Sequence, residues 1–141
     1  RHSAKLRYYP RARNKMSAII KVLSSPVAGN HILHEDETRA RMLPTLGSMW
    51  MLCGKQVRVP MAGTNEKKSV FAAIDIRADA LMYLICDRKR AVDFIEYLEY
   101  VISHYATGKI HIILDNFSVH KARSVQAWLA NHPGVKPYCL P

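Results

Sequence analysis

The clearest feature of the apolar and polar pattern is a nearly continuous apolar run at residues 110–114, which only His111 interrupts. Such a run is typical of a strand buried on both faces, in the middle of a parallel or mixed sheet. The run stops at Asp115, and Ser118 then offers a helix N-cap. Apolar residues at helical spacing follow, namely Ala122, Val125, Trp128 and Leu129. The pattern therefore predicts a buried strand and a helix, with a carboxylate at their junction.

Asp115 is a candidate for chemistry because of this position. In open sheets, ligands bind outside the carboxyl ends of the strands. Aspartate and asparagine also favour turns, so a role for Asp115-Asn116 as a turn alone stays open.

The N-terminal part of the chain predicts a charged arm and a short helix. Residues 1–15 show little apolar periodicity and read as an arm or linker. Helical spacing of Met16, Ile19, Ile20 and Leu23 then predicts an amphipathic helix. It should end near Pro26, since proline disfavours helix in the residue before it.

A second strand is predicted at residues 31–37, where it runs into three consecutive acids. Neighbouring side chains of a strand point to opposite faces. Asp36 should therefore point away from Glu35 and Glu37 and face a site without them.

The remaining pattern completes an α/β fold. Residues 38–63 are rich in glycine and proline and predict an irregular β insertion, with short strands at 49–53 and 56–59. A hairpin is predicted from 69–75 and 80–86, and Asp87 is expected to cap the helix that follows. That helix should bury Ala91, Phe94, Ile95, Leu98, Val101, Ile102 and Tyr105, with Asp93, Glu96 and Glu99 on a solvated face. A last strand is predicted at 135–140. The elements form a mixed sheet flanked by helices.

Length and composition narrow the class of protein. The 141 residues fit one domain, 49% of them are hydrophobic, and the sequence has no apolar run long enough to cross a bilayer. We therefore expect no membrane association. The three cysteines are widely spaced and lack a C-x-x-C pair, which argues against a disulfide framework and a zinc site and favours a reducing compartment. Because the chain begins with Arg1 and shows no leader, it reads as part of a longer protein.

The net charge of +10 is concentrated near the N-terminus. The basic residues that precede the first acid, Glu35, are Arg1, Lys5, Arg7, Arg11, Arg13, Lys15 and Lys21. Such a block suits a polyanion such as DNA, where each neutralised phosphate releases counterions. The alternative is a solvated linker that only keeps the chain in solution. Lys121 and Arg123 are further phosphate-binding candidates, since they lie at a predicted helix start.

Asp36 and Asp115 form the candidate catalytic pair. Their strands could be neighbours in a mixed sheet, and adjacent strands are under ~5 Å apart. Two carboxylates at that separation can share a divalent cation. Their hard oxygen ligands favour Mg²⁺ or Mn²⁺ over zinc.

An ordered set of motifs resembles the catalytic domain of bacterial insertion-sequence transposases, in particular the insertion sequence 630 family, relatives of the mariner transposases. The set comprises Asp36-Glu37, Trp50, Gly54-Lys55, Val59-Pro60, Ile113-Leu114-Asp115-Asn116, His120-Lys121 and Leu140-Pro141. The resemblance implies a ribonuclease-H-like fold for residues 26–141, preceded by a basic arm and short helix at 1–25. It also implies that the core is incomplete, because it stops before the last helix.

The resemblance further implies a DDE or DDD triad. Asp36 would be its first acid and Asp115 its second, and the third would lie downstream of Pro141. His120 matches a histidine that commonly follows the second acid; with Asn116 it would lie beside the metal or a phosphate. The implied reaction is DNA strand cleavage and strand transfer by two Mg²⁺ or Mn²⁺ ions about 4 Å apart. The implied partners are double-stranded DNA, as transposon ends and target, and a second copy in a homodimer. The implied location is the bacterial cytoplasm, at the nucleoid.

Two other functions stay open. The chain could be a non-catalytic DNA-binding remnant of a transposase that lacks the third acid. It could also be another ribonuclease-H-like nuclease, for example one that cuts RNA–DNA hybrids.

Overall fold

The computed structural model describes residues 10–24, 28–41, 47–55, 58, 60 and 63–141. Its helices are α1 (Pro10–Ser24), α2 (Ala91–Ser103) and α3 (Arg123–Asn131), with a 3₁₀ helix η1 (Ser118–Lys121) between β4 and α3. Its strands are β1 (His31–Arg41), β2 (Lys67–Asp75), β3 (Ala80–Cys86), β4 (Ile110–Leu114) and β5 (Val135–Cys139). Among the described residues, no helix has the length and apolar character needed to cross a membrane.

The strands form one mixed sheet in the order β3-β2-β1-β4-β5. β1 pairs antiparallel with β2 and parallel with β4, and β4 pairs parallel with β5. The predicted central strand is confirmed: β4 lies between two parallel neighbours, and all its residues except His111 are buried. The predicted hairpin is also confirmed as β2 and β3.

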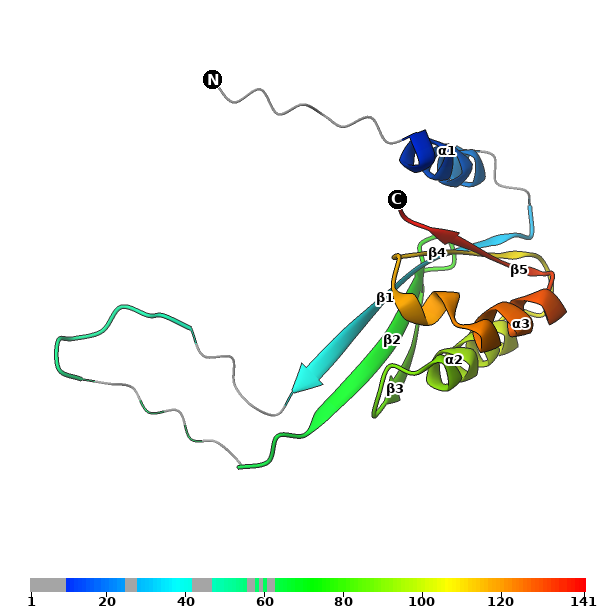
Figure 1. Cartoon of the computed structure of the whole chain (residues 1–141). Coiled ribbons are helices and arrows are strands. Elements are labelled where there is room, and N and C mark those ends of the chain that lie inside the picture. The colour runs from blue at the N-terminus through cyan, green and yellow to red at the C-terminus, as the bar shows by residue number, and fades with distance from the viewer. Residues whose placement is uncertain (1–9, 25–27, 42–46, 56–57, 59, 61–62) are drawn as a thin grey trace, which may run out of the picture.

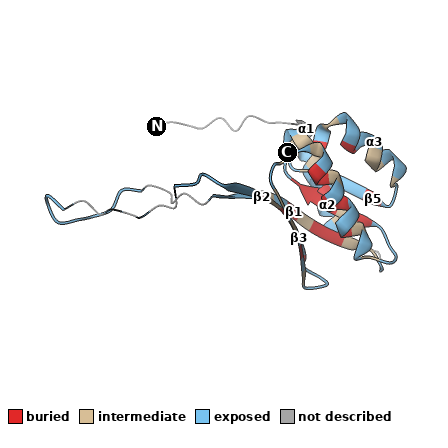
Figure 2. Cartoon of the chain, turned by 90° about the horizontal axis from the view of Figure 1, so that it is seen from below, coloured by how far each residue is buried: buried red, intermediate tan, exposed pale blue. Residues whose placement is uncertain are grey.

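Helices cover the two faces of this sheet (Figure 1). α2 and α3 pack on one face, around a core that includes Leu33, Phe94, Ile112 and Val125. α1 packs on the other face, where Ile19 contacts a smaller cluster. The segment 47–55 lies far from the sheet, and all its residues are exposed (Figure 2). The strand predicted at 49–53 is wrong, because these residues form no ladder with any described strand. The strand predicted at 56–59 lies largely outside the described residues.

α2 shows why the periodicity was informative. Phe94, Leu98 and Val101 are buried as predicted, and Tyr97 joins them on the same face. Burial of each such side chain is worth about 1.5–3 kcal/mol.

The N-terminus of α2 differs from the prediction. Asp93 is buried, and its carboxylate accepts hydrogen bonds from the backbone N–H and the guanidinium of Arg90, at 2.8–3.0 Å. The sequence pattern had placed Asp93 on a solvated face and Asp87 at the cap. Asp87 instead forms an exposed ion pair with Lys68 on β2. Asp93 lies in the first turn, where a carboxylate can reach back to the free N–H groups.

Two other element boundaries also differ. α1 begins at Pro10, so the arm predicted to extend to residue 15 is wrong for its last residues. Proline is favoured at the first position of a helix, and the charged residues after it are good helix formers. Ser118 opens η1 rather than an α-helix, because Ala122 has an extended ψ of 142° and α3 starts only at Arg123.

Candidate active site

The two predicted catalytic acids lie at the same level of two neighbouring strands, Asp36 within β1 and Asp115 directly after β4. The pairing between β1 and β4 runs in register to His34 and Ile113. Asp36 and Asp115 each lie two residues further along. Alternation along β1 puts Asp36 on the face that α1 partly covers. Asp115 follows the last residue of β4, and its carboxylate lies 3.4 Å from His120 Nε2, at the edge of the opposite face. Both residues are exposed. That they share one ion stays a prediction.

The acids on either side of Asp36 point to the opposite face, as strand alternation predicts. Glu35 is 6% exposed, and the side chain of Glu37 is 4% exposed. They follow Leu33, which belongs to the core under α2 and α3. Asp36 stays on the outer face, where its Oδ1 accepts a hydrogen bond from the backbone N–H of Glu37 at 2.8 Å.

His120 of η1 meets these two glutamates inside the protein. It is 4% exposed and packs against the ring of Phe94, with the centroids 4.6 Å apart. Its Nε2 lies 3.1 Å from Glu37 Oε1 and 4.0 Å from Glu35 Oε2. The same nitrogen lies 3.4 Å from Asp115 Oδ1, so His120 joins the buried glutamates to the acid that follows β4.

The polar atoms of this buried cluster lack hydrogen-bond partners. Among the residues that the structure describes, neither oxygen of Glu35, nor Oε1 of Glu37, nor either ring nitrogen of His120 has a hydrogen-bond partner. The 3.1 Å approach between His120 and Glu37 is therefore a close contact without hydrogen-bond alignment.

The electrostatic consequence is largest at Glu35. Burial, followed by the negative charges of Glu37, Asp115 and Asp36, raises the pKa of Glu35 from 4.5 to about 8. Lys89 acts in the opposite direction, as the last of these causes. Glu35 is thus electrostatically coupled to the exposed acids Asp36 and Asp115.

Asp115 also makes the turn that its residue type favours. Its Oδ1 accepts a hydrogen bond from the backbone N–H of Phe117 at 2.8 Å. Its side chain is nevertheless 51% exposed. The turn and a chemical role are compatible, because the turn fixes a carboxylate that solvent can still reach.

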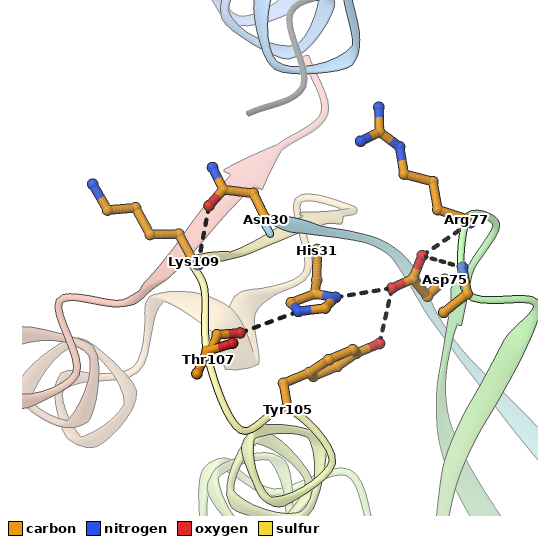
Figure 3. A network of polar contacts seen from close by, with 8 residues as sticks. Asn30, His31, Asp75, Arg77, Tyr105, Thr107 and Lys109 are labelled. Carbon is orange, nitrogen blue, oxygen red and sulfur yellow. Dashed lines mark hydrogen bonds and ion pairs between the residues drawn. The ribbon is translucent and has the colours of Figure 1, made fainter. Parts of the chain in front are cut away.

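A second polar network, at the other end of β1, shows how a buried acid is ordinarily satisfied (Figure 3). Asp75 is 1% exposed, and it accepts hydrogen bonds from the Tyr105 hydroxyl at 3.0 Å and from the backbone N–H groups of Arg77 and Ala78. His31 lies 3.6 Å from the same carboxylate. This network joins the sheet to the loop that follows α2, and both oxygens of Asp75 have partners.

The predicted DNA-binding residues are scattered. Lys121 and Arg123 are exposed beside His120, at the beginning of α3, and Asn116 is exposed next to Asp115. Arg13 is exposed on α1. Arg11 lies in the first turn of α1, and Arg7 lies outside the described residues. Binding of DNA by these residues stays a prediction.

Sequence reasoning missed one candidate site. Ligand atoms of Glu35, Glu37 and His120 all lie within 4.8 Å of one another, which is compact enough to hold a metal ion. Part of this site could be predicted from the sequence, because strand alternation puts Glu35 and Glu37 on the same face of β1 as Leu33. The approach of His120 was not predictable, since it depends on how η1 packs.

The sequence profile of the family described as DDE superfamily endonuclease matches residues 31–141. The chain belongs to this family.

A particular relative is the insertion element IS630 uncharacterized 39 kDa protein of Shigella sonnei. It is 33% identical over 125 residues, which cover 88% of this chain and 36% of the relative. The chain thus spans about a third of that protein. The resemblance to the insertion sequence 630 family is confirmed.

Solved structures agree on the fold. The Mos1 transposase paired-end complex with left transposon end aligns with a TM-score of 0.63 and 14% identity, covering 97% of this chain and 43% of that one. The HTLV-2 integrase catalytic core domain in complex with magnesium aligns with a TM-score of 0.57 and 16% identity, covering 82% and 64%. The ribonuclease-H-like fold is therefore confirmed.

Proposed function

We propose that this chain is the catalytic core of a transposase that cuts DNA strands and joins them to target DNA by metal-dependent phosphoryl transfer. The observation that carries the proposal is the position of Asp36 on β1 and of Asp115 directly after β4, where these two strands are parallel neighbours within the family-matched region. The Mos1 relative, which is seen with a transposon end, supports DNA as the substrate.

Asp36 and Asp115 would hold the divalent cation, Mg²⁺ or Mn²⁺. The donor set fits, since both residues are exposed hard-oxygen donors. Burial is the first cause of the raised pKa of Glu35, and the neighbouring carboxylates of Glu37, Asp115 and Asp36 add to it. When bound, such ions polarise phosphate oxygens and generate the attacking hydroxyl.

The other residues would position the substrate and the acids. Lys121 and Arg123 would contact the DNA backbone, and Asn116 would lie beside the reacting phosphate. His120 is buried, so we assign it to holding Asp115 rather than to contacting DNA. A third acid would come from the part of the full-length protein that follows residue 141.

We further propose that residues 1–25 form a basic DNA-binding arm with a helix and residues 26–141 the core. The full-length protein would act as a homodimer at the bacterial nucleoid.

The test is nicking of supercoiled plasmid that carries the terminal repeats of the element, by a version of the protein extended past residue 141. We expect nicking only with Mg²⁺ or Mn²⁺, and a loss of at least 100-fold in Asp36→Asn and in Asp115→Asn. Asp79→Asn is the matched control, since Asp79 lies in the exposed β2–β3 turn with a φ of 50° that asparagine tolerates. Unchanged nicking by Asp115→Asn would overturn the assignment.

A non-catalytic DNA-binding role is the second candidate, and the net charge of +10 favours it. It predicts salt-sensitive DNA binding that survives both Asp36→Ala and Asp115→Ala, with no nicking by the extended protein. Cutting of RNA–DNA hybrids without dependence on the terminal repeats would instead indicate a different nuclease of this fold.

A further inference from the structure

The buried cluster behind the proposed catalytic acids has the composition of a second cation site. Glu35, Glu37 and His120 come from β1 and η1, and they lie on the sheet face covered by α2 and α3. Asp36, which belongs to the proposed catalytic pair, points to the other face. The two sites would thus be separated by the thickness of β1, with Asp115 at their shared edge.

The distances suit one ion. Ligands of a divalent transition ion lie about 2.0–2.2 Å from it, so two of them can be at most about 4.3 Å apart. The separations from His120 Nε2 to Glu37, Asp115 and Glu35 are 3.1, 3.4 and 4.0 Å, which all satisfy this limit. The ligand atoms of Glu35, Glu37 and His120 all lie within 4.8 Å of one another. Bringing these three groups around one ion therefore needs a shift of only about 0.5 Å.

The unpartnered atoms point to a missing positive charge. Glu35 and His120 are each more than nine-tenths buried, and they present oxygens and nitrogens that no other group satisfies. Buried polar groups without partners are costly, and a buried acid elsewhere in this protein, Asp75, has its partners. A divalent ion would supply positive charge to these carboxyl groups and would also bind the free lone pairs.

We propose that Glu35, Glu37 and His120 form a second binding site for a divalent transition cation such as Mn²⁺ or Zn²⁺, with Asp115 as a shared neighbour. The imidazole nitrogen selects this class of ion over Mg²⁺, which prefers oxygen ligands alone. An ion there would fix η1 against β1 and hold the carboxylate of Asp115 at the end of β4. The inference concerns this cluster and does not require that Asp36 bind metal.

The test measures binding of Mn²⁺ to the EDTA-stripped chain by calorimetry, and nitrogen coupling to the bound ion by pulsed electron paramagnetic resonance. We expect Mn²⁺ to show coupling to an imidazole nitrogen, and Zn²⁺ to compete for the same site. Labelling histidine with ¹⁵N in the folded wild-type chain should change the coupling pattern, which needs no variant. Glu37→Gln and His120→Asn should each weaken this binding by at least about tenfold and remove the coupling.

His34→Asn and Asp36→Asn are the matched controls. His34 lies on the Asp36 side of β1, so a signal from the catalytic face would be lost in these variants, and a signal from the buried cluster would persist. Mn²⁺ bound without nitrogen coupling, or coupling lost in His34→Asn, would overturn the proposal but leave the catalytic function intact. Nitrogen-coupled Mn²⁺ in a protein that never nicks DNA would support this second site and overturn the proposed catalytic function. Absence of any Mn²⁺ binding at millimolar concentration would show that protons alone neutralise the cluster.

Discussion

Replacing Glu35 by glutamine should make the protein more stable at high pH. In the metal-free folded chain the pKa of Glu35 is raised from 4.5 to about 8, first by burial and then by the neighbouring carboxylates. Between these values the folded chain keeps the proton and the unfolded chain releases it. The stabilising contribution of Glu35 is therefore complete below pH 4.5 and is lost as the pH rises to 8. Glutamine stays neutral at every pH, so the Glu35→Gln variant does not lose this stabilisation as the pH rises.

The size of the effect follows from the two pKa values. The span from 4.5 to about 8, at about 1.36 kcal/mol per pH unit, sets an upper limit of about 5 kcal/mol. Relaxation of the cluster and entry of water reduce this, so we expect Glu35→Gln to exceed the wild type by roughly 2 kcal/mol at pH 8 and by about zero at pH 4.5.

The assay is urea denaturation in EDTA at several pH values, followed by circular dichroism. Glu96→Gln is the control, because Glu96 is exposed on the same helix that covers the cluster. It should follow the wild type at every pH. Parallel stability curves for wild type and Glu35→Gln would refute the reasoning, since they would mean that Glu35 ionises in the folded protein as easily as in the unfolded one.

Three further predictions, one of them with a matched control variant, concern backbone geometry, a buried hydroxyl and pH dependence. Gly108→Ala should cost about 3 kcal/mol in urea denaturation, because Gly108 has a φ of +96° and an added Cβ would lie 1.7 Å from the Gly29 carbonyl oxygen. Gly134→Ala, which meets nothing within 4 Å, should stay within about 0.5 kcal/mol, and equal losses would contradict the geometry. Tyr97→Phe should stabilise by about 1 kcal/mol, since its buried hydroxyl has no partner; a clear loss would reveal one. Burial and two nearby lysines lower the pKa of His111. Its stabilising contribution is therefore complete above pH 6.5 and falls as the pH drops below it, so His111→Gln should lose less melting temperature between pH 7.5 and 5.5 than the wild type does. An equal loss in both proteins would disprove this.

The sequence by itself determined the features that depend on local periodicity. Residues 110–114 could only be a strand buried on both faces, and the helical spacing of Phe94, Leu98 and Val101 defined the buried side of α2. The alternation of a strand likewise separated Asp36 from the two glutamates beside it. These features follow from the geometry of one element, so no distant residue was needed to predict them.

Only the tertiary structure decided which elements meet. The parallel pairing of β1 with β4 brings Asp36 and Asp115 to one end of the sheet, and the packing of η1 brings His120 to the buried glutamates. The N-terminus of α2 also depends on tertiary contacts, because Asp87, the predicted cap, forms an ion pair with Lys68 on β2. Contacts between residues far apart in the chain depend on how whole elements pack, and a hydrophobic pattern read along one segment carries no information about the segment it will lie against.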